Sequence, residues 1–187
     1  VAEIDDARRI PEFVSRAFYT ATSGRPGPVV LALPEDMLTE FVETADARPY
    51  KRVPILPGAA DMAKLGQMLA KAKKPVAIVG GGGWTDKARA DFEAFAAAQN
   101  LPVVASFRCQ DFFDNQHACY AGHAGVGINP NLGKFIQDSD LLLVVGARLG
   151  EMTTQGYTLI DIPTPKQTLV HVYADPNEIG RTYQPEL

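Results

Sequence analysis

The stretch Lys74–Asp86 (KPVAIVGGGGWTD) constrains the fold more than any other part of this sequence. The apolar run Pro75–Val79 suits a strand that is buried on both faces of a parallel sheet. A helical pattern covers Asp86 to Gln99, and four glycines precede it: Gly80, Gly81, Gly82 and Gly83. A strand, a glycine turn and a helix together bring backbone N–H groups close to a phosphate. The glycines form a run and not G-x-G-x-x-G, so a tight turn that binds nothing is the alternative interpretation.

Composition excludes several classes of partner. The 187 residues are 46% hydrophobic and 21% charged, which is typical of a globular protein with one domain, or with one domain and a piece of another. A net charge of −4 disfavours nucleic acid and anionic membranes as partners. No apolar run approaches the roughly 20 residues of a membrane span. Cys109 and Cys119 form no C-x-x-C pair or zinc-ligand set, which favours a reducing, cytoplasmic location.

The pattern after residue 57 predicts an α/β fold. Strands are expected at 76–79, 103–105, 141–145 and 169–172, and helical patterns alternate with them. Strands and helices in this order form a doubly wound parallel sheet of the Rossmann-like type. Residues 106–129 are expected to be irregular.

The first 57 residues are expected to belong to a different part of a larger protein. A helix is predicted at 10–22 and an apolar strand at 29–33, and such a pair cannot bury its apolar faces alone. The sheet neighbours of that strand are therefore expected to lie outside this chain. Residues 1–36 are interpreted as a partial domain and 37–57 as a proline-rich linker. Residues 58–187 are interpreted as a nearly complete second domain, cut at its C-terminal end.

Five segments, in order, carry a resemblance to a known family: 23–36 (SGRPGPVVLALPED), 74–83 (KPVAIVGGGG), 117–125 (HACYAGHAG), 140–148 (DLLLVVGAR) and 171–180 (HVYADPNEIG). They resemble the thiamine-diphosphate-dependent enzymes of the acetolactate synthase type, which form or cleave carbon–carbon bonds of 2-oxo acids as transferases or lyases. The resemblance implies that residues 1–36 end the pyrimidine-binding domain. It implies that residues 58–187 are the central domain, whose fold is of the DHS-like NAD/FAD-binding type.

The same resemblance implies that catalysis lies outside this chain. In the family, a glutamate of the pyrimidine-binding domain protonates the aminopyrimidine of thiamine diphosphate, and a Gly-Asp-Gly…Asn motif of the diphosphate-binding domain holds Mg²⁺ and the diphosphate. Neither element is present here. No catalytic residue and no metal ligand is therefore expected, and the chain alone is expected to be inactive. Its implied partners are the pyrimidine-binding and diphosphate-binding domains of the same polypeptide, in a homodimer or homotetramer.

The central domain of relatives holds FAD, ADP or no nucleotide. The resemblance places a nucleotide diphosphate at Gly80–Gly83, with Gly146 and Arg148 from the 140–148 segment and Asp175 near the ribose. A guanidinium pairs well with phosphate, although Arg148 has the alternative of an ion pair with Glu151 or Asp161. Two departures from the family pattern, Tyr173 and Ala124, disfavour FAD more than they disfavour ADP.

Other classes of function remain open at this point. A free-standing nicotinamide- or flavin-binding oxidoreductase shares the glycine turn and the sheet, but the acid expected about 20 residues after the glycines is missing. A sirtuin-like deacylase would need four zinc-binding cysteines, and the sequence has two. A structural domain that binds nothing is also compatible with the sequence.

Overall fold

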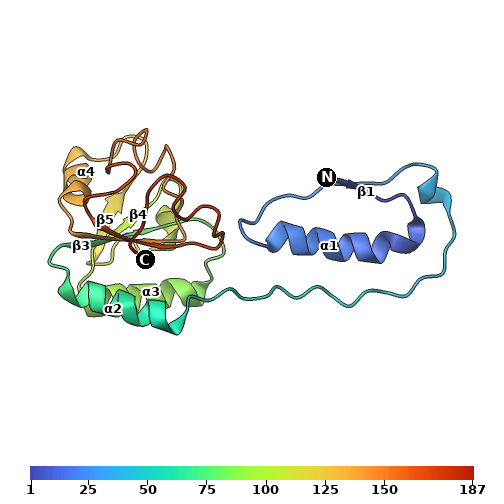
Figure 1. The fold of residues 1–187 in the computed structure, drawn as a ribbon, viewed down its shortest axis with the longest axis horizontal. Coiled ribbons are helices and arrows are strands. Elements are labelled where there is room, and N and C mark those ends of the chain that lie inside the picture. The colour runs from blue at the N-terminus through green and yellow to red at the C-terminus, as the bar shows by residue number, and fades with distance from the viewer. The chain divides into compact units, whose positions relative to one another are not determined.

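The computed structural model describes residues 1–187 and divides them into two compact units, Val1–Ile55 and Leu56–Leu187. Each unit is described by itself (Figure 1). The division falls inside the predicted linker at 37–57, where a 3₁₀ turn covers Met37–Thr39 and residues 40–57 form no helix or strand. None of the helices has the length and apolar character needed to cross a membrane.

The first unit consists of one helix and one pair of very short strands. Helix α1 spans Ile10–Thr22, as the sequence predicts. Strand β2 covers only Leu31–Ala32 and pairs in parallel with β1, Ala2–Glu3. The expectation that this strand finds its neighbours only outside the chain was therefore wrong, because β1 is too short for a sequence pattern to reveal it.

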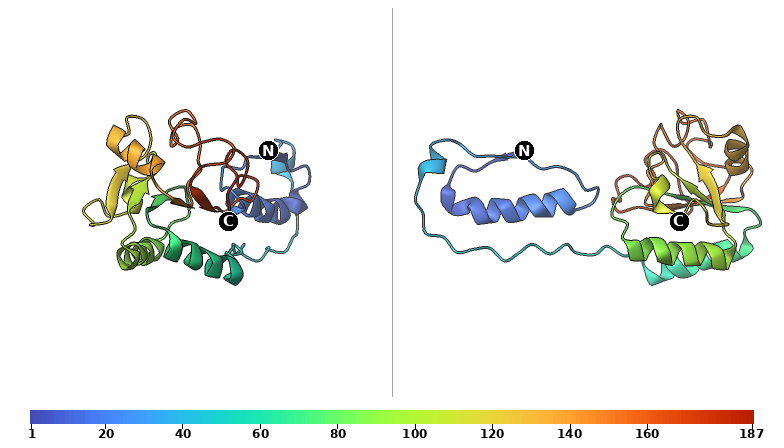
Figure 2. Two further views of the ribbon diagram at one scale, coloured as in Figure 1. Left: turned by 60° about the vertical axis from the view of Figure 1, so that its left-hand side comes forward. Right: turned by 180° about the vertical axis from the view of Figure 1, so that it is seen from behind.

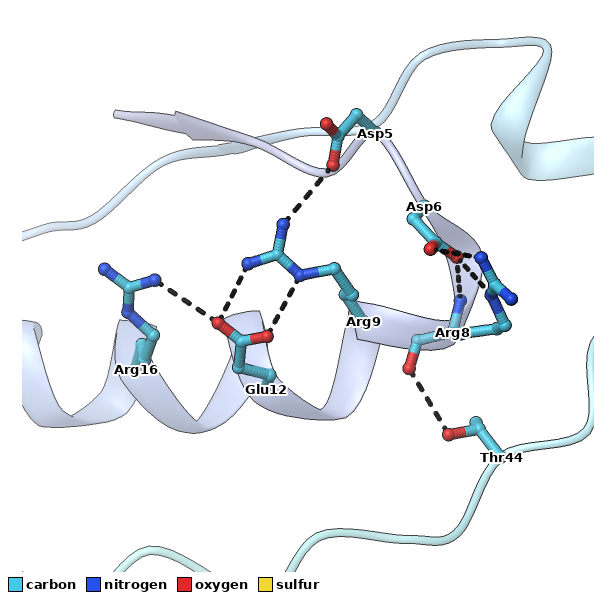
Figure 3. Close-up of polar contacts among 7 residues, drawn as sticks. All are labelled: Asp5, Asp6, Arg8, Arg9, Glu12, Arg16 and Thr44. Carbon is cyan, nitrogen blue, oxygen red and sulfur yellow. Dashed lines mark hydrogen bonds and ion pairs between the residues drawn. The ribbon is translucent and has the colours of Figure 1, made fainter.

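Polar contacts fix the start of α1 (Figure 3). Arg9 pairs with Glu12 through two hydrogen bonds of 3.0 Å, and Arg16 reaches the same carboxylate at 3.4 Å. The Arg9 guanidinium lies 4.7 Å from the ring centroid of Phe13. The pKa of Glu12 lies below its ordinary value. The hydrogen bonds from Arg9 are the largest cause, and the charges of Arg9 and Arg16 contribute less. These are local interactions, and α1 itself contributes no buried residue.

The second unit contains a five-stranded sheet in which all neighbours are parallel, in the order β5-β4-β3-β6-β7. The predicted doubly wound parallel sheet is confirmed. Its strands are β3 (Pro75–Val79), β4 (Val103–Ala105), β5 (Tyr120–His123), β6 (Leu141–Val145) and β7 (Thr168–Val172).

The edge strand β5 lies within 106–129, the segment that the sequence predicts to be irregular, so that expectation was wrong. Its sequence, YAGH, has no apolar run, and Gly122 adopts a φ of +125°. The register with β4 also shifts between Val103 and Val104. An irregular edge strand of this kind lacks the alternation on which strand prediction depends.

Helices cover both faces of the sheet. Helix α2 (Ala59–Lys71) and helix α3 (Asp86–Gln99) lie on one side, and α4 (Pro130–Gln137) lies on the other (Figures 1 and 2). Because side chains alternate along a strand, β3 supplies both cores. Val76 and Ile78 join the core that contains α4, whereas Ala77 and Val79 join the core of α2 and α3.

The strand order reverses at β3, which has β4 on one side and β6 on the other. In an open parallel sheet, ligands bind in the crevice outside the carboxyl ends of the strands at such a reversal. The fold therefore directs attention to the turns that follow β3, β4 and β6.

Candidate functional site

The glycine turns after β3 and β6 pack directly against each other. Gly81 has a φ of +82°, and a Cβ atom there would overlap the carbonyl oxygen of Gly146. Gly146 has a φ of +70°, and its Cβ would lie 2.5 Å from the carbonyl oxygen of Gly80. Both the backbone conformation and the lack of space therefore require glycine at positions 81 and 146.

The Trp84 side chain anchors the turn after β3, and the backbone N–H groups of Gly81–Gly83 in this turn make no hydrogen bond within the protein. The indole Nε1–H of Trp84 donates a hydrogen bond of 2.9 Å to the Gly80 carbonyl, and its ring packs edge-on against Phe92 at 5.7 Å. None of the backbone–backbone hydrogen bonds of the structure uses the N–H groups of Gly81, Gly82 or Gly83. A Cβ built on Gly82 would meet nothing within 4 Å. This cradle suits an anion such as a phosphate.

Helix α3 begins just after this cradle. The Thr85 hydroxyl caps the helix by accepting a hydrogen bond of 3.1 Å from the Ala88 N–H. Asp86 lies in the first turn and pairs with Arg89. The carboxylate of Asp86 is thus engaged within its own helix.

A pocket of about 460 Å³ opens beside the glycine turns, which lies within the range of roughly 300–1,000 Å³ for small-molecule sites. Two of the predicted site residues, Gly81 and Arg148, line it together. The other lining residues come from the segments after β4 and β6: Ser106, Phe107, Cys109, Gly150, Glu151, Met152, Thr153 and Tyr157. The predicted Gly80, Gly82, Gly83, Gly146 and Asp175 do not line this pocket.

Arg148 forms an ion pair, although with neither of the partners that the sequence suggests. Its Nε–H donates a hydrogen bond of 2.8 Å to Glu178, whose side chain is only 12% exposed. Arg181 approaches the same carboxylate at 3.7 Å. Neither Glu151 nor Asp161 pairs with Arg148, because the chain after β7 brings Glu178 back to the end of β6. The charge of Arg148 is therefore partly neutralised within the protein.

Asp175 opens the turn that carries Glu178. One of its carboxylate oxygens accepts hydrogen bonds from the backbone N–H of Asn177 at 3.0 Å and from its side-chain amide at 2.9 Å. The Glu178 N–H donates to the Asp175 carbonyl at 3.1 Å. Asp175 thus shapes the turn, and Glu178 is the acid of that turn that reaches Arg148.

His171 is a buried histidine near the site that the sequence did not single out. It lies in β7, is 7% exposed, and its Nε2–H points to the Ala147 carbonyl at 3.0 Å. Burial lowers the pKa of His171, so the imidazole is neutral near pH 7. A neutral donor at this position fixes the backbone between Gly146 and Arg148.

Tyr157 enters the pocket from an unusual backbone. Gln155, Gly156 and Tyr157 have φ values of +52°, +67° and +63°, although two of the three are not glycine. At the two non-glycine positions such conformations cost about 1–3 kcal/mol each and persist where surrounding contacts hold them. Here the Gly156 N–H binds the Glu151 carbonyl at 2.8 Å, and the buried Thr154 hydroxyl binds the Gly150 carbonyl at 2.9 Å. No sequence pattern indicates this run.

The family model that matches this chain is that of the thiamine pyrophosphate enzyme, central domain, and it covers residues 62–187. The chain belongs to the thiamine pyrophosphate enzyme family. The family predicted from the sequence, and its central domain, are confirmed.

No group of three or more His, Cys, Asp or Glu side chains is arranged to hold a metal ion.

Similar proteins agree with this assignment. The acetolactate synthase large subunit of Corynebacterium glutamicum is 32% identical over 183 residues, covering 95% of this chain and 29% of that protein. Isozyme 3 of the Escherichia coli acetolactate synthase large subunit is 33% identical over 92% of this chain and 31% of its own length. The crystal structure of benzoylformate decarboxylase from Polynucleobacter necessarius superposes with a TM-score of 0.76 at 28% identity, covering 94% of this chain and 33% of that one. The chain thus spans about a third of the length of these relatives.

Proposed function

We propose that this chain is the central domain, together with the end of the pyrimidine-binding domain, of an enzyme that forms or cleaves carbon–carbon bonds of 2-oxo acids. The family match and the acetolactate synthases among the relatives support this reaction class. Thiamine diphosphate and Mg²⁺ supply the chemistry in such an enzyme, from domains beyond these residues. The role of residues 58–187 is to position those domains within a cytoplasmic homodimer or homotetramer.

The second part of the proposal is that the central domain binds an adenine nucleotide, ADP in preference to FAD. The observation that carries it is the meeting of two glycine turns beside a pocket that also contains Arg148. The free N–H groups of Gly81–Gly83 would hold the diphosphate, and Arg148 would approach from the end of β6. Tyr173 stands where FAD- and ADP-binding relatives often carry an acid, and its ring centroid lies 5.8 Å from that of His171. Ala124, at the position where the flavoenzymes of the family place a histidine, is the departure that disfavours FAD in particular.

The test uses the full-length protein. Its absorption spectrum and the mass spectrum of any released nucleotide identify a resident ligand, and calorimetry then measures the affinity for ADP. Arg148→Ala should weaken ADP binding by about 1.5 kcal/mol, the lower end of the range for charge-assisted hydrogen bonds, because Glu178 already shares this guanidinium.

Arg181→Ala is the matched control, since Arg181 also pairs with Glu178 but does not line the pocket. Equal ADP affinity in wild type and Arg148→Ala would leave Arg148 as a structural ion-pair residue. A colourless protein that releases no nucleotide and binds no added ADP would contradict the nucleotide site.

A further inference from the structure

Ser106 follows β4 and lies against the glycine turn of β3. Its N–H donates to the Val79 carbonyl at 2.8 Å, which ties the end of β4 to the end of β3. A Cβ atom at Gly80 would overlap the Ser106 hydroxyl and lie 2.9 Å from the Ser106 Cβ. Gly80 is therefore glycine because the serine side chain occupies the space beside it.

The Ser106 hydroxyl has no hydrogen-bond partner in the protein, although the residue is only 5% exposed. It lines the pocket, and it is not sealed in the core as the unpartnered Tyr183 hydroxyl is. Ser139 is equally buried, and its hydroxyl donates a hydrogen bond of 2.7 Å to the Ile136 carbonyl. The Ser106 oxygen keeps access to the pocket, so a ligand there can supply the hydrogen bond that the protein does not.

Two other side-chain donors at these strand ends are already engaged. The Trp84 indole binds the Gly80 carbonyl, and the Arg148 Nε binds Glu178. Ser106 therefore offers an uncommitted hydroxyl beside Gly80, in the pocket that Gly81 also lines.

We infer that the Ser106 hydroxyl donates a hydrogen bond to a phosphate oxygen of a nucleoside diphosphate held by the β3 glycine turn. This inference rests on the proposed nucleotide site and adds a specificity residue to it. Three strand ends then contribute to one anion site: backbone N–H groups after β3, a neutral hydroxyl after β4 and a shared guanidinium after β6.

Calorimetry on the full-length protein tests this inference with ADP and with adenosine, which lacks the diphosphate. Ser106→Ala should weaken ADP binding by about tenfold, as expected for one hydrogen bond to a charged group, and leave adenosine affinity unchanged. Ser139→Ala should leave both affinities unchanged, because that hydroxyl lies away from the pocket and has its partner inside the protein.

Thermal unfolding of the ligand-free variants gives an independent readout. Ser106→Ala loses no protein hydrogen bond, so its melting temperature should equal or exceed that of wild type, whereas that of Ser139→Ala should fall. Wild type that binds ADP while Ser106→Ala binds it equally well would overturn this inference alone. Equal losses for ADP and adenosine would overturn the phosphate contact. Wild type that binds no ADP would overturn the proposed nucleotide site, and the inference with it.

Discussion

Residues 1–55 and 56–187 maintain their structure by different means. The first unit buries three apolar side chains, Ile4, Ala7 and Met37, and surrounds the start of α1 with exposed ion pairs. The second unit places two apolar cores on opposite faces of one sheet, and its strands β3 and β6 are almost entirely inaccessible to solvent.

This difference shows that a helix can be predicted accurately from its sequence and still bury little apolar surface. The sequence of α1 specifies a helix through the spacing of its apolar residues, a proline in its first turn and local charge pairs, yet none of its residues is buried. Burial of apolar surface is the dominant favourable term in folding, so the second unit holds most of the free energy of unfolding in this chain.

Truncation of a core side chain should give the largest change in the free energy of unfolding. Leu142→Ala removes a side chain with 0% exposure from β6 and should lower the free energy of unfolding of the second unit by about 2–5 kcal/mol. Leu38→Ala is the same change in the first unit, at 60% exposure, and should alter stability by no more than about 0.5 kcal/mol. Urea denaturation followed by circular dichroism measures both variants. Similar losses for the two leucines would contradict the contrast between the units.

Substitution of one glycine in each unit, Gly81 and Gly27, should give an intermediate change in stability. Gly81→Ala forces a side chain into a left-handed backbone and against the Gly146 carbonyl, which should cost about 1–3 kcal/mol. Gly27→Ala in the first unit meets nothing within 4 Å and needs no positive φ, so its stability should stay close to that of wild type. Hydrogen exchange of the β3 and α1 amides reports the two units separately. A tolerated Gly81→Ala would show that the two turns do not need this close contact.

The exposed ion pairs should give the smallest effect. The pKa of Glu12 is lowered in the folded state, so its contribution is present above the unfolded value of about 4.3 and is lost as pH falls through the folded pKa. Glu12→Gln should slightly reduce protection of the α1 amides at low salt, and the difference should vanish near 1 M salt, where screening is strong.

Glu43→Gln is the matched control, because Glu43 lies in the same unit without a salt-bridge partner. Equal effects of the two substitutions on α1, or a Glu12→Gln effect that persists at high salt, would show that the ion pairs do not support the helix.

Much of the fold was predictable from local patterns. The 3.6-residue period gave α1 with its observed bounds, and apolar runs gave β3, β4, β6 and β7 to within a residue. Strand β5 could not be predicted in this way, because its conformation depends on pairing with β4 and on Gly122.

The glycine turn after β3 is recognisable from its own residues, whereas Arg148 and Asp175 were implied by the family resemblance. Gly81 and Arg148 follow apolar strands, and the structure brings both to one pocket. The partner of Arg148 is 30 residues further along the chain, so no local pattern could select Glu178 over Glu151 or Asp161. Ser106 carries no motif, and only the missing partner of its hydroxyl in three dimensions distinguishes it.

The position of Trp84 has a practical consequence. It is the single tryptophan of the chain, and its indole is hydrogen-bonded to the first glycine of the β3 turn. Any rearrangement of that turn changes the environment of the indole, whereas the first 55 residues contribute no tryptophan emission. Selective excitation of indole fluorescence therefore provides an intrinsic optical probe of this one turn, with no label and no engineered reporter.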